Sequence, residues 1–175
     1  MASVIDPSAA SLSMRLQGLI GLLENPAPIW EAVGFTLAEN TKLRITDQED
    51  VEGRPFQPSV RAQVQGGQTL LDRGLLRNSI TYFAEKQGVE WGVPSEFPYA
   101  RILNEGGTIV PKTKTALRFQ VGGHWCSRRK VTIPARRFLG ISKADQQDVL
   151  DVINGFLKGN EWKTISAQNP RSSLA

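Results

Sequence analysis

Hydrophobic residues recur at helical spacing near the start of the chain. Five of them occupy positions i, i+4, i+7, i+8 and i+11 on one face of an α-helix: Leu12, Leu16, Leu19, Ile20 and Leu23. Asn25-Pro26 should end this helix, because the residue before a proline disfavours helical backbone. A second helix is expected from near Pro28 to about Arg44, since proline suits the first helical turn.

Period-two alternation and short apolar runs predict strands in the middle of the chain. We expect two hairpins, one with its turn at Gly88 and one with a loop over 122–129, built from strands at 79–84, 89–93, 116–121 and 130–133. Between and before them, short helices are predicted at about 60–64, capped by Ser59, and at 99–104, opened by Pro98.

A last helix is predicted after Ser142, which is a credible N-cap. Its apolar face carries Val149, Ile153, Phe156 and Leu157, and Gly159 ends it. The fold class is therefore α+β: N-terminal helices, a small and mostly antiparallel sheet of about four strands, and a C-terminal helix packed on that sheet.

One domain is expected over residues 1–159, with a helical part at 1–46 and the sheet and last helix at 47–159. Residues 160–175 are polar apart from Trp162, Ile165 and Leu174, so they cannot add much core and are predicted to form a C-terminal arm. We expect this arm to be held by a neighbouring subunit, which makes Trp162 an interface candidate.

Charge is distributed unevenly along this chain of 175 residues, whose formal net charge is +4. The first 52 residues hold eight acids and three bases, whereas residues 101–143 hold ten bases and one acid, Glu105. The chain is electrically bipolar, so we expect charged partners, either nucleic acid or an acidic protein surface.

The sequence lacks the residues that several classes of functional site require. A single cysteine, Cys126, and a single histidine, His124, are too few for a zinc site, and no glycine-rich phosphate-binding loop occurs. The pair could serve nucleophilic catalysis only if its segment were extended, and it falls in the predicted 122–129 loop. We expect no enzyme activity, no cofactor and no metal. The lone cysteine, the absence of a signal peptide and the absence of a long apolar run favour folding in a reducing cytoplasm without membrane insertion.

Two basic segments are candidates for interfaces. Arg128, Arg129 and Lys130 lie beside an aromatic residue and could contact nucleic acid or protein. Arg136 and Arg137 follow a predicted strand end, where at least one should project outward and could pair with a carboxylate of another subunit. The alternative for Arg136 and Arg137 is a solvated basic edge that protects a strand from pairing.

Local patterns over roughly residues 45–157 resemble the phage virion morphogenesis family, also called tail completion proteins, of Mu-like and P2-like tailed bacteriophages. The resemblance is carried by five segments in order: Gly53-Arg54-Pro55-Phe56-Gln57-Pro58, then Leu70 through Ile80, Val89-Glu90-Trp91-Gly92, Tyr99-Ala100, and Val131 through Ser142 with Asp145. The first 44 residues lie largely outside it. Asn104-Glu105 stands where family members often have His-Gln, and Phe56 where tryptophan is common.

The resemblance implies a structural virion protein of the head–tail junction, a tail completion, tail terminator or neck ring protein assembled in the host cytoplasm. Its expected partners are further copies of itself in a ring, expected to be a hexamer, and other neck and tail proteins such as the connector or stopper and the tail tube. Two alternatives stay open: an assembly chaperone absent from the mature virion, and a basic neck protein that contacts DNA non-specifically in the ring lumen. The acids Asp47, Glu49, Asp50 and Glu52 would be the only dense site for a nuclease or hydrolase, and their connector setting favours a solvated loop.

Overall fold

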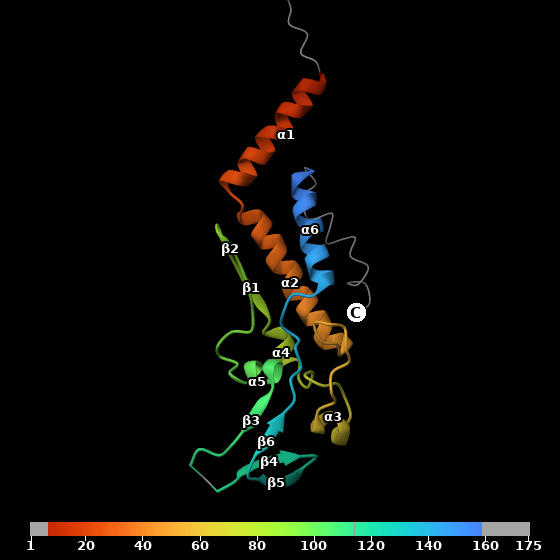
Figure 1. Ribbon diagram of the computed structural model, residues 1–175, viewed down its shortest axis with the longest axis vertical. Coiled ribbons are helices and arrows are strands. Elements are labelled where there is room, and N and C mark those ends of the chain that lie inside the picture. The colour runs from red at the N-terminus through yellow and green to blue at the C-terminus, as the bar shows by residue number, and fades with distance from the viewer. Residues whose placement is uncertain (1–6, 114, 159–175) are drawn as a thin grey trace, which may run out of the picture. The chain divides into compact units, whose positions relative to one another are not determined.

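The computed structural model describes residues 7–113 and 115–158, and for residues 7–15 only the backbone. The helices are α1 (Pro7–Glu24), α2 (Ala27–Asp47), α3 (Val60–Gln65), α4 (Leu75–Asn78), α5 (Tyr99–Glu105) and α6 (Lys143–Leu157) (Figure 1). The strands are β1 (Thr81–Glu85), β2 (Gly88–Gly92), β3 (Gly107–Ile109), β4 (Leu117–Val121), β5 (His124–Arg128) and β6 (Val131–Ile133). The α+β class and the C-terminal helix are confirmed.

Most predicted helices are confirmed, with longer bounds. The Ser59 side chain caps α3 by accepting a hydrogen bond from the Ala62 backbone N–H at 3.1 Å, and α5 begins directly after Pro98. The one-turn helix α4 was not predicted, because four residues are too few for a periodic pattern. It follows Gly74, whose φ of +77° lies in the left-handed region that favours glycine.

The strands pair differently from the prediction. Instead of about four strands in one sheet, the described residues contain three separate two-stranded sheets: β1–β2, β3–β6 and β4–β5. The turn of the first hairpin is formed by Lys86 and Gln87, and Gly88 belongs to β2. The predicted 122–129 loop is wrong, since it contains β5, which pairs antiparallel with β4.

Local backbone geometry explains this error. Gly122 and Gly123 have φ values of +58° and +80°, so they form a tight two-residue turn that brings β5 back along β4 at once. Residues 131–133 are thereby freed to pair with β3, with Thr108 opposite Thr132. This pairing brings Gly106 so close to Ala135 that a Cβ on Gly106 would lie 2.6 Å from the Ala135 backbone nitrogen.

The chain forms two compact units, and neither is continuous in sequence. Unit 1 contains residues 1–36, 82–90 and 143–175, and unit 2 contains residues 37–81 and 91–142. The predicted single domain over 1–159 stays a prediction.

In unit 1, buried apolar side chains come from α2 and α6, namely Ala32, Val33 and Val152. Gly34 lies against the β1–β2 hairpin, because a Cβ at this position would approach Tyr82 Cδ2 within 2.4 Å and Val89 Cγ2 within 2.6 Å. The absence of a side chain at Gly34 therefore allows the helix to contact the hairpin directly.

Unit 2 has a core of Ile45, Phe56, Leu76, Ile80 and Phe138 with several smaller residues. Polar groups join its loops: the Gln48 amide donates to the Thr69 carbonyl oxygen at 2.8 Å and accepts from the Thr69 N–H at 2.6 Å.

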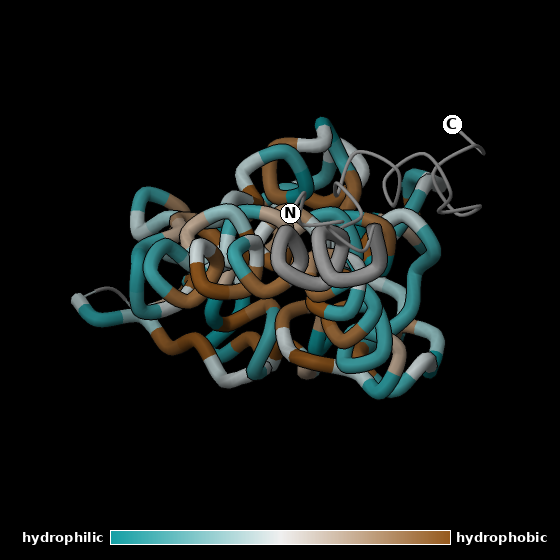
Figure 2. Tube along the Cα trace, turned by 90° about the horizontal axis from the view of Figure 1, so that it is seen from above, coloured by the Kyte–Doolittle hydropathy of each residue, from teal (hydrophilic) through white to brown (hydrophobic). Residues whose placement is uncertain are grey.

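Apolar and polar stretches alternate along the coils of the chain in Figure 2, as in amphipathic helices.

The predicted C-terminal arm, residues 160–175, lies outside the described residues, and so does Trp162. None of the described helices combines the length and the apolar character needed to cross a membrane.

Candidate assembly interface

The β4–β5 hairpin and the two residues after it present four exposed bases of unit 2, Arg118, Arg128, Arg129 and Lys130. Its register places Gln120 opposite Trp125 and Arg118 opposite Ser127. Since side chains alternate between the faces of a strand, these four residues share one face, and Leu117, Phe119 and Val121 share the other. The second face is the half-buried one, as the burial of β4 shows. Gly122 at the turn lies close to α3, because a Cβ added at this position would lie 2.7 Å from Val64 Cγ1.

Trp125 is the most exposed aromatic residue among the described side chains, at 74% exposure. Arg118 is its diagonal neighbour across the two strands, within reach of a long side chain. Arg128, Arg129 and Lys130 are also exposed, at the end of β5 and just after it. No acid occurs in the sequence between Glu105 and Asp145, so nothing in this run offsets their charge. We name the Trp125 face, together with Arg129, the basic hairpin surface.

His124 and Cys126 lie in β5 rather than in a loop, which corrects the prediction. Both belong to the same face of the strand, and the Cys126 thiol lies 4.0 Å from the His124 backbone carbonyl oxygen. A nucleophilic pair would require the thiol at the imidazole ring. Among the described residues, no group of three or more His, Cys, Asp or Glu is arranged to hold a metal ion.

The two arginines of the Pro134–Phe138 segment have different environments. Arg136 is only 5% exposed, and its Nε donates to the Gln57 carbonyl oxygen at 2.8 Å. Burial lowers the pKa of this guanidinium. Arg136 therefore ties the 53–58 loop to the segment before Phe138, and of these two interface candidates it is Arg137 that projects outward. Arg137 is exposed, with an ion pair of 3.7 Å to Glu52.

Further hydrogen bonds, from two other parts of unit 2, hold residues 138–140. Arg44 Nη1 donates to the carbonyl oxygens of Phe138 and Gly140, at 2.9 and 3.2 Å. The Asn104 side-chain oxygen accepts from the Leu139 N–H at 2.9 Å. No local sequence pattern could indicate these roles, because the hydrogen-bonded partners lie 35 to 96 residues apart in the chain. The strongest sequence motif of the chain is thus a structural element of unit 2.

Two of the four acids at 47–52, Asp50 and Glu52, pair with arginines. Asp50 accepts hydrogen bonds from the backbone N–H groups of Glu52 and Arg54 and from Arg54 Nε, all between 2.8 and 3.0 Å. Burial raises the pKa of Asp50, but these hydrogen bonds outweigh it and the net pKa is lowered. Glu52 contacts both Arg54 and Arg137. These hydrogen bonds and ion pairs stabilise the folded conformation of the loop.

The β1–β2 hairpin of unit 1 presents an acidic face that the sequence reading missed. Tyr82 and Val89 point toward Gly34 of α2, so by alternation Phe83, Glu85 and Glu90 point away from it. Phe83 is 66% exposed, and both carboxylates are exposed. On the opposite face, burial and the neighbouring Glu31 raise the pKa of the Tyr82 hydroxyl.

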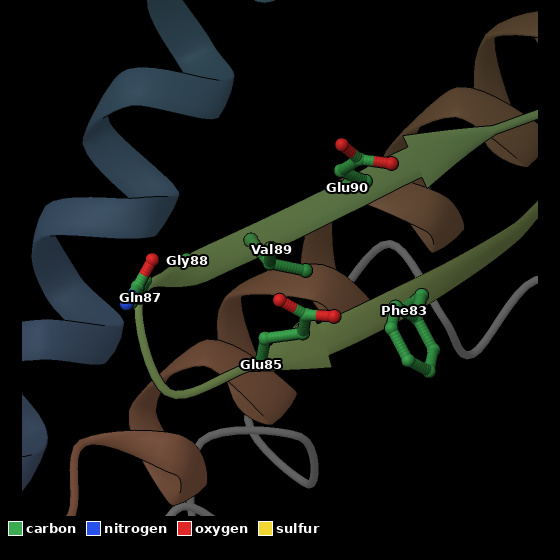
Figure 3. A pocket seen from close by; sticks show the side chains of 6 residues that line it. All are labelled: Phe83, Glu85, Gln87, Gly88, Val89 and Glu90. Carbon is green, nitrogen blue, oxygen red and sulfur yellow. The ribbon is translucent and has the colours of Figure 1, made fainter.

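A hollow of about 380 Å³ lies on this hairpin, lined by Phe83, Glu85, Gln87, Gly88, Val89 and Glu90. Figure 3 shows that Phe83 and Glu85 come from one strand, Val89 and Glu90 from the other, and Gln87 from the turn. Its size is at the lower end of the range for ligand sites, roughly 300–1,000 Å³. We name Phe83, Glu85 and Glu90 the acidic hairpin surface. An alternating strand with Phe and Glu on one face was the signal that could have indicated it.

Comparison with known families decides the wider assignment. The profile of the phage virion morphogenesis family matches residues 8–158. The chain belongs to the phage virion morphogenesis family. This match extends over the N-terminal helices, so the expectation that the first 44 residues lie largely outside the family is wrong. Searches of curated proteins and of solved structures gave no match.

Family membership assigns the chain a role in phage morphogenesis. For such a protein, exposed charged and aromatic surfaces are more informative than a catalytic constellation. The described residues offer two of them, one basic and one acidic, each on a two-stranded hairpin.

Proposed function

We propose that the protein is a structural component of the head–tail junction, where copies assemble into a ring, a hexamer in the simplest case, and complete the tail before the head attaches. The observation that carries the proposal is the family match over residues 8–158. The protein acts by binding rather than by catalysis. Its other partners are neighbouring neck and tail proteins, such as the connector or stopper and the tail tube.

The distribution of charge supports ring assembly. A closed ring of identical subunits uses heterologous contacts, in which one surface of a subunit meets a different surface of the next. Residues 91–142 hold nine bases and two acids, whereas the segments of unit 1 together hold nine acids and six bases. Unlike charges on two surfaces favour correct docking and disfavour wrong pairings.

Copy number in purified virions tests this function. Quantitative mass spectrometry of mature particles and of isolated tails should find about six to twelve copies per particle, located at the neck. Absence from mature virions together with presence in assembly intermediates would favour the second candidate, an assembly chaperone.

A direct role in DNA contact is the third candidate, and the exposed bases Arg128, Arg129 and Lys130 favour it. In a ring these side chains would meet DNA in the lumen without reading its sequence. Magnesium-dependent nuclease activity of the purified protein would contradict all three candidates.

A further inference from the structure

Two exposed surfaces of the chain are complementary in chemistry and in size. The basic hairpin surface has Trp125 at its centre with Arg118 and Arg129, and the acidic hairpin surface has Phe83 with Glu85 and Glu90. All four strands, β1, β2, β4 and β5, are five residues long, so the two hairpins have equal length, about 17 Å each.

We propose that the basic hairpin surface of one copy docks on the acidic hairpin surface of a second copy, and that this heterologous contact closes the ring. The inference rests on the proposed function, because it needs copies of the chain to associate. It deepens that function by naming both faces of the subunit contact.

The aromatic residues supply the centre of this contact. Trp125 and Phe83 are 74% and 66% exposed, although tryptophan and phenylalanine are usually covered. Tryptophan and arginine are the residues most enriched at the energetic centres of protein interfaces. The hollow beside Phe83 offers a concave site for the indole ring, and a ring pair in edge or offset geometry adds specificity to the burial of area.

The charged residues set how the two hairpins align and disfavour other partners. Glu85 and Glu90 line the hollow and no basic side chain does, although the exposed Lys86 lies in the turn of the same hairpin; the two carboxylates disfavour nucleic acid and favour a cationic partner. Arg118 lies on the same face as Trp125, and arginine pairs with carboxylates through two parallel hydrogen bonds. The chain thus carries both halves of one charge-complementary contact.

Charge reversal on each hairpin tests the contact in the full-length protein. One variant carries Arg118→Glu with Arg129→Glu, and the other carries Glu85→Arg with Glu90→Arg. Light scattering coupled to size exclusion, at about 0.1 M salt, should show that each variant alone needs at least about tenfold more protein than the wild type to assemble. Circular dichroism should show that both remain folded, because all four side chains are exposed.

An equimolar mixture of the two variants is the decisive sample. In the mixture every contact between unlike variants joins one basic and one acidic hairpin, so assemblies of wild-type size should return at a protein concentration at which neither variant assembles alone. Trp125→Ala should weaken assembly by about tenfold or more with the charges intact. The matched control for the arginine variant is Lys112→Glu with Arg73→Glu, which changes the net charge by the same amount at exposed sites outside the hairpin. It should assemble as the wild type does.

The possible failures are distinguishable. A wild type that stays monomeric at every concentration overturns both the ring and the hairpin contact. A wild type that assembles while both charge-reversed variants assemble equally well overturns the hairpin contact alone. Binding of a double-stranded DNA fragment that is lost in Arg118→Glu with Arg129→Glu, while assembly is unchanged, would assign the basic hairpin to nucleic acid and overturn the proposal.

Discussion

Replacement of Gly34 by alanine tests how closely α2 approaches the β1–β2 hairpin in unit 1. A Cβ at this position would lie 2.4 Å from Tyr82 Cδ2, 2.6 Å from Val89 Cγ2 and 2.9 Å from Tyr82 Cγ. These atoms cannot move away easily. Cγ is the ring atom nearest the Tyr82 backbone, and the branched Val89 side chain is restricted at χ1. The hairpin must therefore shift away from the helix.

The magnitude follows from two opposing effects. Overpacking of this kind destabilises by about 1–3 kcal/mol. Alanine in place of glycine within a helix stabilises by about 0.5–1 kcal/mol. The net expectation for Gly34→Ala is a loss of about 0.5–2 kcal/mol. Gly21 of α1 is the matched control, since nothing lies within 4 Å of its Cβ position and the same replacement should only stabilise.

Urea denaturation followed by circular dichroism, at one fixed protein concentration, measures both variants against the wild type. The midpoint should fall for Gly34→Ala and stay level or rise for Gly21→Ala, which isolates the packing effect of about 1–3 kcal/mol as their difference. In thermal melts each kcal/mol corresponds to about 2–4 °C for a chain of this size. Equal midpoints for the two variants would refute the close approach.

Two further predictions concern unit 2. Arg136→Ala should lower the free energy of unfolding by about 2–3 kcal/mol, because it removes a buried charged hydrogen bond to the Gln57 carbonyl oxygen. Arg137→Ala should change the free energy of unfolding by less than about 1 kcal/mol, because the ion pair of Arg137 is exposed. Equal losses for the two variants in chemical denaturation would contradict this prediction. Because the folded-state pKa of Asp50 is lowered, its contribution is present above the unfolded pKa near 3.8 and is lost as pH falls through the folded value. Asp50→Asn should therefore reduce stability at pH 7 and flatten the decline between pH 5 and 2, and an unchanged decline would show that Asp50 does not hold Arg54.

Helix prediction succeeded where local signals were complete. Ser59 and Pro98 marked helix starts correctly, and the periodic Leu12 to Leu23 face lies within α1. Strand pairing was harder, because it depends on which segments meet. The doublet Gly122-Gly123 was a visible turn signal, yet the reading extended it into a loop and missed β5. Polar strands such as β5, with a burial pattern that exposes four of five residues, carry no clear alternation.

The interface residues show the same limit. Basic residues were identified from sequence because charge density needs no fold, and Arg128, Arg129 and Lys130 are indeed exposed. The sequence could not show which of Arg136 and Arg137 projects outward, since the burial of Arg136 depends on the Gln57 carbonyl oxygen, 79 residues away in the chain. Phe83, Glu85 and Glu90 were missed although strand alternation places Phe83 and Glu85 on one face, because alternation does not say which of the two faces packs on Gly34.

The sequence by itself determined the α+β class, the helix positions, the family and the bipolar charge of this protein, because each of these depends on residue type and local spacing. Only the tertiary structure decided which strands pair, which arginine is buried, and which faces of the two hairpins remain exposed. Those outcomes depend on contacts between residues far apart in the chain, where a single close approach, such as Gly34 on Tyr82 or Gly106 on Ala135, selects one arrangement over the others.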